Sequence, residues 1–209
     1  MLTANSHGMH RLLWFKFLVS FFFFAAVSPL LCQVRPAVSG GMSSISVGSA
    51  FAVYNVDLGP NRMDGVTVWS DWQPGFVPPP FRGIGLELEV RDINMNSSPT
   101  APSVYRMETF GGGPMYTWNR YPRIRPYAKF IMSYGEIDWS NPNPLFRHET
   151  RTVYAPGGGF DAHVYRHIWF RADYEYQFWA NIAGTPDTIN PHGFNFGVSY
   201  HLNHLSPEE

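Results

Sequence analysis

The stretch "IWFRADYEYQFW", residues 168–179, decides the fold, because it alternates bulky apolar or aromatic residues with charged or polar ones. Side chains two positions apart lie on the same face of an extended chain. One face therefore holds Ile168, Phe170, Ala172, Tyr174, Tyr176 and Phe178, and the other holds Arg171, Asp173, Glu175 and Gln177. The pattern predicts a β-strand with two chemically opposed faces. If the charged face meets the exterior, the protein is an ordinary soluble one; if the aromatic face does, the exterior is lipid.

Beyond residue 43 the chain contains eight extended segments, with no helical period between them. They cover residues 44–58, 63–73, 83–95, 104–118, 124–139, 149–165, 168–181 and 192–202. Most connections after odd-numbered segments are longer and polar, whereas those after the fourth and sixth, "NRYPR" and "YRH", are tight; "GPNR" and "PGFVPPPFRG" are exceptions. Short turns at one end and longer loops at the other are typical of a transmembrane barrel.

The composition also favours a protein that meets lipid. Charged residues make up 15% of the 209 residues, below the roughly 25% of soluble domains, while aromatic residues make up 17%. The formal net charge is −1, so the chain has neither a nucleic-acid footprint nor a polybasic membrane patch. We therefore expect no nucleic-acid partner.

The N-terminal residues 1–33 are typical of an export signal. The basic residues His10, Arg11 and Lys16 accompany an apolar run over residues 17–27. That run is too short for a transmembrane helix of about 20 residues, although a single membrane anchor is the alternative interpretation.

The sequence therefore predicts a signal peptide over 1–33 whose cleavage site is left open, a short segment over 34–43, an outer-membrane barrel over 44–202 and a tail over 203–209. Cys32 is the only cysteine and would leave with the signal. The mature chain would then have no disulfide, thiol chemistry or cysteine metal site.

Three features assign lipid to the aromatic face. The apolar face continues over about ten residues per strand, which is the length that a tilted strand needs to cross a bilayer. Aromatic residues fall near strand ends, where the aromatic girdles of barrels lie. The predicted girdle consists of Trp69, Trp72, Trp118, Trp139, Trp169 and Trp179, with Tyr121 beside them.

The third feature is that the charges on the opposite face nearly cancel. An eight-stranded barrel is just wide enough for side chains to fill it, and a confined polar interior requires paired charges. The predicted interior network consists of Arg91, Arg106, Lys129, Arg151 and Arg171 with Glu87, Glu89, Glu108, Asp161, Asp173 and Glu175. We predict an all-β, eight-stranded antiparallel up-and-down transmembrane barrel with a side-chain-filled polar interior.

A weak internal repeat relates residues 111–134 to residues 157–178: each has three glycines, a strand, a basic turn and an aromatic strand. Neither glycine run is followed by Lys-Ser/Thr and a helix, so neither is a phosphate-binding loop. In strands, such glycines allow curvature and the close approach of large side chains.

The motifs "GGGPMYTW", "RPYAKF", "APGGGF", "RADYEYQFW" and "FGVSYHL" resemble the small outer-membrane barrels of the OmpA and opacity-protein family over residues 44–202. The resemblance implies location in the outer membrane, with its lipid bilayer and the barrel-assembly machinery as partners. It also implies an assembly signal at Gly197, Tyr200 and Leu202, although the family usually ends this strand on an aromatic residue.

For function, we expect a non-enzymatic protein with a structural or surface-interaction role, whose outer loops contact an unknown extracellular ligand. A narrow porin-like pore is one alternative, and the crowded interior disfavours it. A lipid-modifying enzyme is another, because acyl transfer and hydrolysis need a nucleophile activated by a histidine. The candidates for that chemistry are His148, Glu149, His192, Asp187 and Ser140, which no nucleophile motif surrounds.

We expect neither a metal nor a cofactor. Two histidines four residues apart along a strand, such as His163 and His167, lie about 13 Å apart. The same objection applies to His201 and His204, which straddle the last strand and the tail.

Overall fold

The fold was analysed in a computed structural model that describes residues 43–56, 62–78, 81–95, 104–139, 148–180 and 188–202. The predicted signal peptide and tail lie outside these residues, as does nearly all of segment 34–43. No helix among the described residues is long and apolar enough to cross a membrane.

The described residues form nine antiparallel strands, which make eight crossings because β7 and β8 are separated only by Gln177 and both pair with β6. The bounds are β1 Ser44–Asn55, β2 Met63–Gln73, β3 Ile84–Met95, β4 Val104–Thr117, β5 Ile124–Trp139, β6 His148–Tyr165, β7 Ile168–Tyr176, β8 Phe178–Trp179 and β9 His192–His201.

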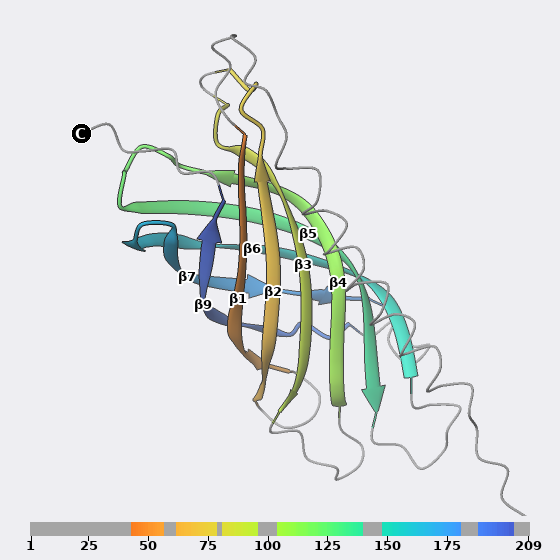
Figure 1. Cartoon of the computed structure of the whole chain (residues 1–209). Coiled ribbons are helices and arrows are strands. Elements are labelled where there is room, and N and C mark those ends of the chain that lie inside the picture. The colour runs from red at the N-terminus through yellow and green to blue at the C-terminus, as the bar shows by residue number, and fades with distance from the viewer. Residues whose placement is uncertain are drawn as a thin grey trace, which may run out of the picture. The chain divides into compact units, whose positions relative to one another are not determined.

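The sheet closes on itself (Figure 1). Each crossing pairs with the next along the chain, and β9 pairs with β1 from Ser46↔His201 to Asn55↔His192. Closure leaves no free edge strand among the described residues, although residues 148–152 at the loop end of β6 pair with β5 alone. The predicted eight-stranded antiparallel up-and-down barrel is therefore confirmed.

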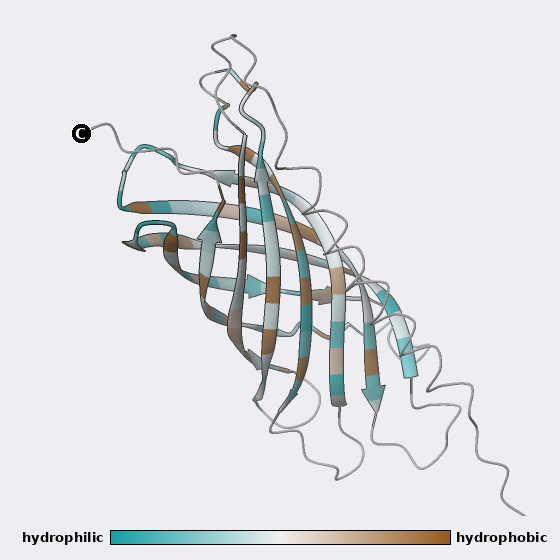
Figure 2. Ribbon diagram, in the orientation of Figure 1, coloured by the Kyte–Doolittle hydropathy of each residue, from teal (hydrophilic) through white to brown (hydrophobic). Residues whose placement is uncertain are grey.

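The two faces alternate as the opening stretch predicts. On β7, Arg171, Asp173 and Glu175 are buried, whereas Ile168 and Tyr174 are exposed. Figure 2 shows the same alternation of apolar and polar residues along the other strands. The exposed apolar residues, which include Leu86, Leu88 and Val90 on β3 and Phe194, Phe196 and Val198 on β9, form an apolar belt around the barrel.

The two ends of the barrel differ in their connections. At one end, only Arg166 and His167 join β6 to β7, and Arg166 has a φ of 45°, which closes this tight turn. Residues 118–123 join β4 to β5 at the same end, where β1 begins and β9 ends. We call this the short-turn end, and the opposite one the loop end. In barrels of this kind the short turns lie on the periplasmic side.

Glycines of the internal repeat make room for long side chains inside the barrel. A Cβ atom on Gly157 would lie 3.3 Å from Lys129 Cε and 3.3 Å from Glu175 Cγ. Gly135 has a similar role beside Trp179, whose ring would lie 2.3 Å from an added Cβ. The glycines are therefore placed where the narrow interior must accept its largest side chains.

Placing a cation in the middle of the apolar belt should destabilise the barrel strongly. We expect Leu88→Arg to lower the free energy of unfolding in lipid vesicles by about 2–4 kcal/mol, because the guanidinium must lie in hydrocarbon. Ile84→Arg, near the short-turn end of the same strand, is the matched control and should cost about 0–1 kcal/mol. Equal losses, measured by urea titration, would contradict the lipid-facing assignment of Leu88.

Candidate functional site

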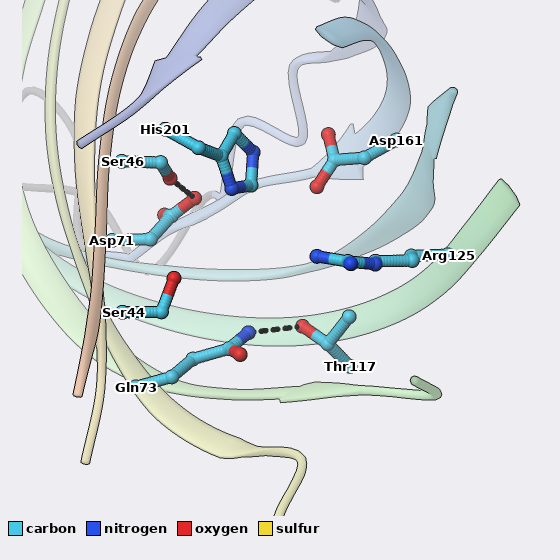
Figure 3. A pocket seen from close by; sticks show the side chains of 8 residues that line it. All are labelled: Ser44, Ser46, Asp71, Gln73, Thr117, Arg125, Asp161 and His201. Carbon is cyan, nitrogen blue, oxygen red and sulfur yellow. Dashed lines mark hydrogen bonds between the residues drawn. The ribbon is translucent and has the colours of Figure 1, made fainter. Parts of the chain in front are cut away.

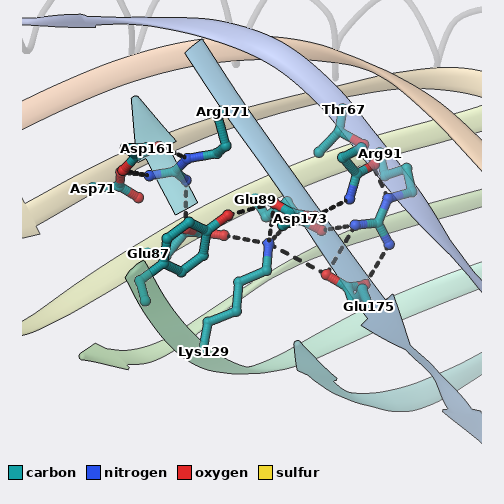
Figure 4. A network of polar contacts seen from close by, with 12 residues as sticks. Thr67, Asp71, Glu87, Glu89, Arg91, Lys129, Asp161, Arg171, Asp173 and Glu175 are labelled. Carbon is teal, nitrogen blue, oxygen red and sulfur yellow. Dashed lines mark hydrogen bonds and ion pairs between the residues drawn. The ribbon is translucent and has the colours of Figure 1, made fainter. Parts of the chain in front are cut away.

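The lumen contains a cluster of ionised side chains at its centre, which we call the charge network (Figure 4). Its members come from β2, β3, β5, β6 and β7 and are each 5% exposed or less. They are Asp71, Glu87, Glu89, Arg91, Lys129, Asp161, Arg171, Asp173 and Glu175. Charges buried so completely are stable only when they are paired and hydrogen-bonded.

Arg91 organises the side of the network nearer the loop end. Its guanidinium lies 2.6 Å from Glu175 Oε1 and 2.5 Å from Glu89 Oε1, and its Nε donates to Thr67 at 3.0 Å. The Arg91 Cζ also lies 4.6 Å from the centre of the Tyr54 ring. The planar fork of arginine suits this bidentate contact with Glu175.

Lys129 occupies the centre of the network. Its Nζ lies 2.7 Å from both Glu87 and Glu89 and 3.4 Å from Glu175, with Asp173 at 3.7 Å. The ammonium therefore joins carboxylates from β3 and β7, which lie on different sides of the lumen.

Arg171 organises the side nearer the short-turn end. It donates to both oxygens of Asp161 at 2.7 and 3.0 Å, to Asp71 at 2.6 Å and to Glu87 at 2.9 Å. Its Cζ lies 4.7 Å from the Trp69 ring centre and 4.6 Å from that of Tyr127. These rings add cation–π contacts to the ion pairs.

Eight of the eleven residues predicted for the interior network lie in the charge network, and Asp71 is an additional member that the sequence reasoning missed. Asp71 lies on β2, whose apolar pattern is less regular than that of later strands. The signal that could have revealed it is the spacing of Thr67, Trp69 and Asp71, which lie two residues apart and therefore share one face of β2. In the structure all three side chains are buried.

Three predicted members lie elsewhere. Arg106 and Glu108 were assigned inward, and this is wrong: they lie on the outer face near the loop end, where they pair with each other and Arg106 also pairs with Asp92. Met107 and Thr109 take the inward positions between and beyond them, so the alternation of β4 turns Arg106 and Glu108 outward. Arg151 lies at the loop end of β6, half-exposed, and pairs with Glu149 at 2.5 Å.

The filled interior also contains an apolar part, towards the loop end, that the sequence reasoning did not predict. Ten side chains, each 2% exposed or less, pack together there: Ala52, Tyr54, Val56, Met63, Ile93, Met107, Ile137, Val153, Trp179 and Ile189. We call them the apolar plug. The lumen therefore holds two layers in series, the apolar plug and the charge network.

Most of the predicted girdle tryptophans lie inside the barrel. The assignment is wrong for Trp69, Trp169 and Trp179, which are buried, and Trp139 packs against the apolar plug. Trp169 and Trp179 share the face of Arg171 and Glu175 in the period-two pattern, so proximity to a strand end misled the interpretation. Two members are exposed on the outer face as a girdle requires: Trp72 and Trp118.

The described histidines do not form the catalytic arrangement that a hydrolase needs. His192 Nδ1 lies 3.2 Å from the carbonyl oxygen of Asn190, and Glu149 pairs with Arg151. Ser140 and Asp187 lie outside the described residues. The neighbours of His148 are Asp138, with Oδ1 at 2.5 Å, and Glu136, with Oε1 at 3.7 Å.

The carboxylates of Glu136 and Asp138 and the imidazole of His148 place their ligand atoms within 4.8 Å of one another, on the outer face at the loop end. The sequence analysis did not predict this grouping, because Glu136 and Asp138 lie on β5 and His148 lies on β6, and their proximity depends on how the two strands pair. Of the histidines considered in the sequence, His163 Nε2 lies 2.9 Å from the Arg166 carbonyl oxygen and His167 Nδ1 lies 3.0 Å from that of His201. His204 lies outside the described residues.

A closed barrel with an apolar belt outside and an ionised cluster inside defines a transmembrane β-barrel protein. The family model for the outer membrane protein beta-barrel domain matches residues 17–201. The chain belongs to this family, and its location is the outer membrane. No curated protein matches the chain significantly.

Solved structures show the same fold. Neisserial surface protein A is similar with a TM-score of 0.51 and 11% identity, covering 76% of this chain and 96% of its own. The N-terminal β-barrel domain of Pseudomonas aeruginosa OprF has a TM-score of 0.52 and 13% identity, covering 78% and 99%. OprG from the same organism has a TM-score of 0.50 and 11% identity, covering 78% and 98%. The OmpA- and opacity-like resemblance of the sequence is thus confirmed at the level of family and fold.

The predicted assembly signal lies on and just beyond β9. Gly197 packs against Ser49 and Ala50 of β1, while Tyr200 and Leu202 are exposed on the outer face. Recognition of these residues by the barrel-assembly machinery stays a prediction.

Removing Arg171 should destabilise the barrel, because it leaves Asp71, Asp161 and Glu87 without their shared cation. We expect Arg171→Ala to cost roughly 3–5 kcal/mol and Arg171→Lys to cost less. Arg106→Ala is the control on the outer face, where partial exposure limits the loss to about 1 kcal/mol or less. The transition temperature on a heat-shift gel checks this, and an unchanged transition in Arg171→Ala would refute the structural role of the network.

Proposed function

We propose that the protein is a non-enzymatic, non-conducting outer-membrane barrel that supports surface-exposed loops, through which it contacts an extracellular ligand. The observation that carries this proposal is the filling of the lumen by two different layers. A barrel that only holds loops at a membrane surface would need neither layer. The two layers together oppose the passage of solutes through the lumen, which supports a non-conducting barrel.

The apolar plug opposes ions, because an ion that enters it must lose its hydration without gaining a partner. The ring of Trp179 is fully buried in this layer, beside Gly135. The charge network opposes apolar solutes and also holds its own groups tightly, since Arg91, Lys129 and Arg171 each contact carboxylates from two or more strands. A solute that crosses the lumen would have to pass an apolar layer, which excludes ions, and then an ionised layer, which excludes apolar groups.

Planar-bilayer recordings test the closed lumen against the pore alternative. We expect no steady channels from the refolded protein. Trp179→Ala and Lys129→Ala, made separately, should also stay closed, because each leaves the other layer in place. The combined variant should conduct, provided that a heat-shift gel shows it to be folded. Steady conductance by the unmodified protein would refute the proposal.

Release of acyl chains tests the enzymatic alternative. We expect no hydrolysis of phospholipid or lipopolysaccharide esters by the protein in mixed micelles, because the described contacts of His148 and His192 include no nucleophile. Ester hydrolysis that disappears in His148→Ala or in His192→Ala would contradict the non-enzymatic role. His163→Ala, at the short-turn end, is the matched control.

A further inference from the structure

A small polar pocket lies in the lumen at the short-turn end, beyond the charge network (Figure 3). Ser44 and Ser46 of β1, Asp71 and Gln73 of β2, Thr117 of β4 and His201 of β9 form much of its wall. Arg125 and Asp161 complete the wall, which thus combines hydroxyl, amide, carboxylate, imidazole and guanidinium groups with the aliphatic parts of the same side chains, and the space is about the size of a single water molecule. Its position at the end of the strands gives it access from the periplasmic side.

Two residues of the pocket wall, Asp71 and His201, carry buried polar atoms without hydrogen-bond partners, and two more such atoms lie in the next row of inward residues. Among the described residues, the buried side-chain atoms that lack a partner are Asp71 Oδ1, His201 Nε2, Trp69 Nε1 and Ser199 Oγ. In the register of the strands, Ser46 of β1 lies opposite Asp71 on β2 and His201 on β9. Gly48 of β1 likewise lies opposite Trp69 on β2 and Ser199 on β9. The four atoms thus lie in two adjacent rows across β2, β1 and β9. Buried polar groups are rarely left unpaired, so their gathering indicates a missing occupant.

The unpaired carboxylate oxygen of Asp71 is exceptional in the charge network. Asp71 is 5% exposed, and its Oδ2 accepts hydrogen bonds from Ser46 at 2.9 Å and Arg171 at 2.6 Å, while Oδ1 accepts none. Both oxygens of each of the other five carboxylates have a partner. One acceptor position, on Oδ1, is therefore open at Asp71.

The charge of the lumen favours a cation in this place. The network contains six carboxylates and three cations, so it carries a surplus of three negative charges. Asp64 is a further buried carboxylate outside the network, and Arg62 pairs with it at 2.9 Å near the loop end. Among the residues that line the pocket, Arg125 is the one arginine or lysine, and it offsets part of this surplus. A cation bound at the pocket would gain Coulomb attraction from the rest of the surplus.

We propose that this pocket binds a small monovalent inorganic cation, such as Na⁺, through Asp71 Oδ1. The hydroxyls of Ser44, Ser46 and Thr117 supply further oxygen ligands. A divalent ion fits less well, because it prefers six to eight oxygen ligands and several carboxylates, and two guanidinium groups, of Arg125 and Arg171, lie close to the pocket. An anion would meet the surplus negative charge. This inference does not depend on whether the lumen conducts.

The direct test is ²³Na line broadening with the refolded full chain in a zwitterionic detergent. At fixed pH and ionic strength, with N-methyl-D-glucamine replacing the competing cation, we expect saturable broadening that K⁺ displaces. The same titration should raise the unfolding temperature, because an ion that binds only the folded state stabilises it.

Asp71→Asn should abolish both effects, since it removes the unpaired charge. Asp92→Asn, which removes a partly exposed carboxylate on the outer face, is the matched control and should retain them. Thr117→Val keeps the shape and every ion pair of the network, so it should fold and weaken Na⁺ binding several-fold even if Asp71→Asn does not fold.

Two results would overturn the proposal. Absence of broadening, with equal unfolding temperatures in Na⁺ and N-methyl-D-glucamine, means that the pocket holds water alone. An unfolding temperature that changes with pH but not with the cation means that protons carry the surplus charge.

Discussion

Pairing of buried charges across a lumen filled by side chains is the constraint on which the rest of this barrel depends. Lys129 contacts carboxylates of β3 and β7, and Arg171 joins β2, β3 and β6. Asp161 of β6 is a register neighbour of Arg171 on β7, but the contacts of Lys129 with β3 and β7 and of Arg171 with β2 and β3 link strands that share no backbone hydrogen bonds. They also explain Gly157 of the repeat, which leaves the space that the Lys129 and Glu175 side chains fill. The apolar belt holds the barrel in lipid, but the charge network determines which side chains can fit inside.

The interior of the barrel changes in chemistry along the barrel axis, from an apolar layer to an ionised one. Towards the loop end, the apolar plug closes the barrel by packing, with Trp179 and Met107 among its fully buried side chains. Towards the short-turn end, the interior is polar and carries more negative than positive charge. Outside, near the loop end, the partly exposed carboxylates Asp92 and Glu108 share the cation of Arg106 above the apolar belt. The membrane-spanning part thus combines a tightly packed apolar layer with an ionised one, and further charged pairs lie at its loop end.

The period-two pattern predicted the strands and their inward and outward faces, because shifting the register of a strand by one residue would place its ionised groups in lipid. The predicted segments 63–73 and 124–139 match β2 and β5 at both ends. The candidate site was predicted less well. Arg106 and Glu108 were judged by their charge rather than by the alternation of β4, which turns Met107 inward. Trp169 and Trp179 were judged by their place near strand ends, although their spacing from Arg171 puts them inside. Pairing partners and the unpaired Asp71 oxygen depend on side chains from distant strands, which no local pattern reveals.

The seam between β1 and β9 has a consequence for how the molecule is made. These strands stand at opposite ends of the chain, and their ten paired positions from Ser46↔His201 to Asn55↔His192 complete the cylinder. Until the final ten-residue ribbon arrives, β1 and β7 each present a row of unsatisfied backbone groups. Those groups cannot be tolerated in hydrocarbon, so the closed cylinder is the form that the bilayer accepts. We therefore expect a chain that lacks β9 to form no stable barrel in lipid.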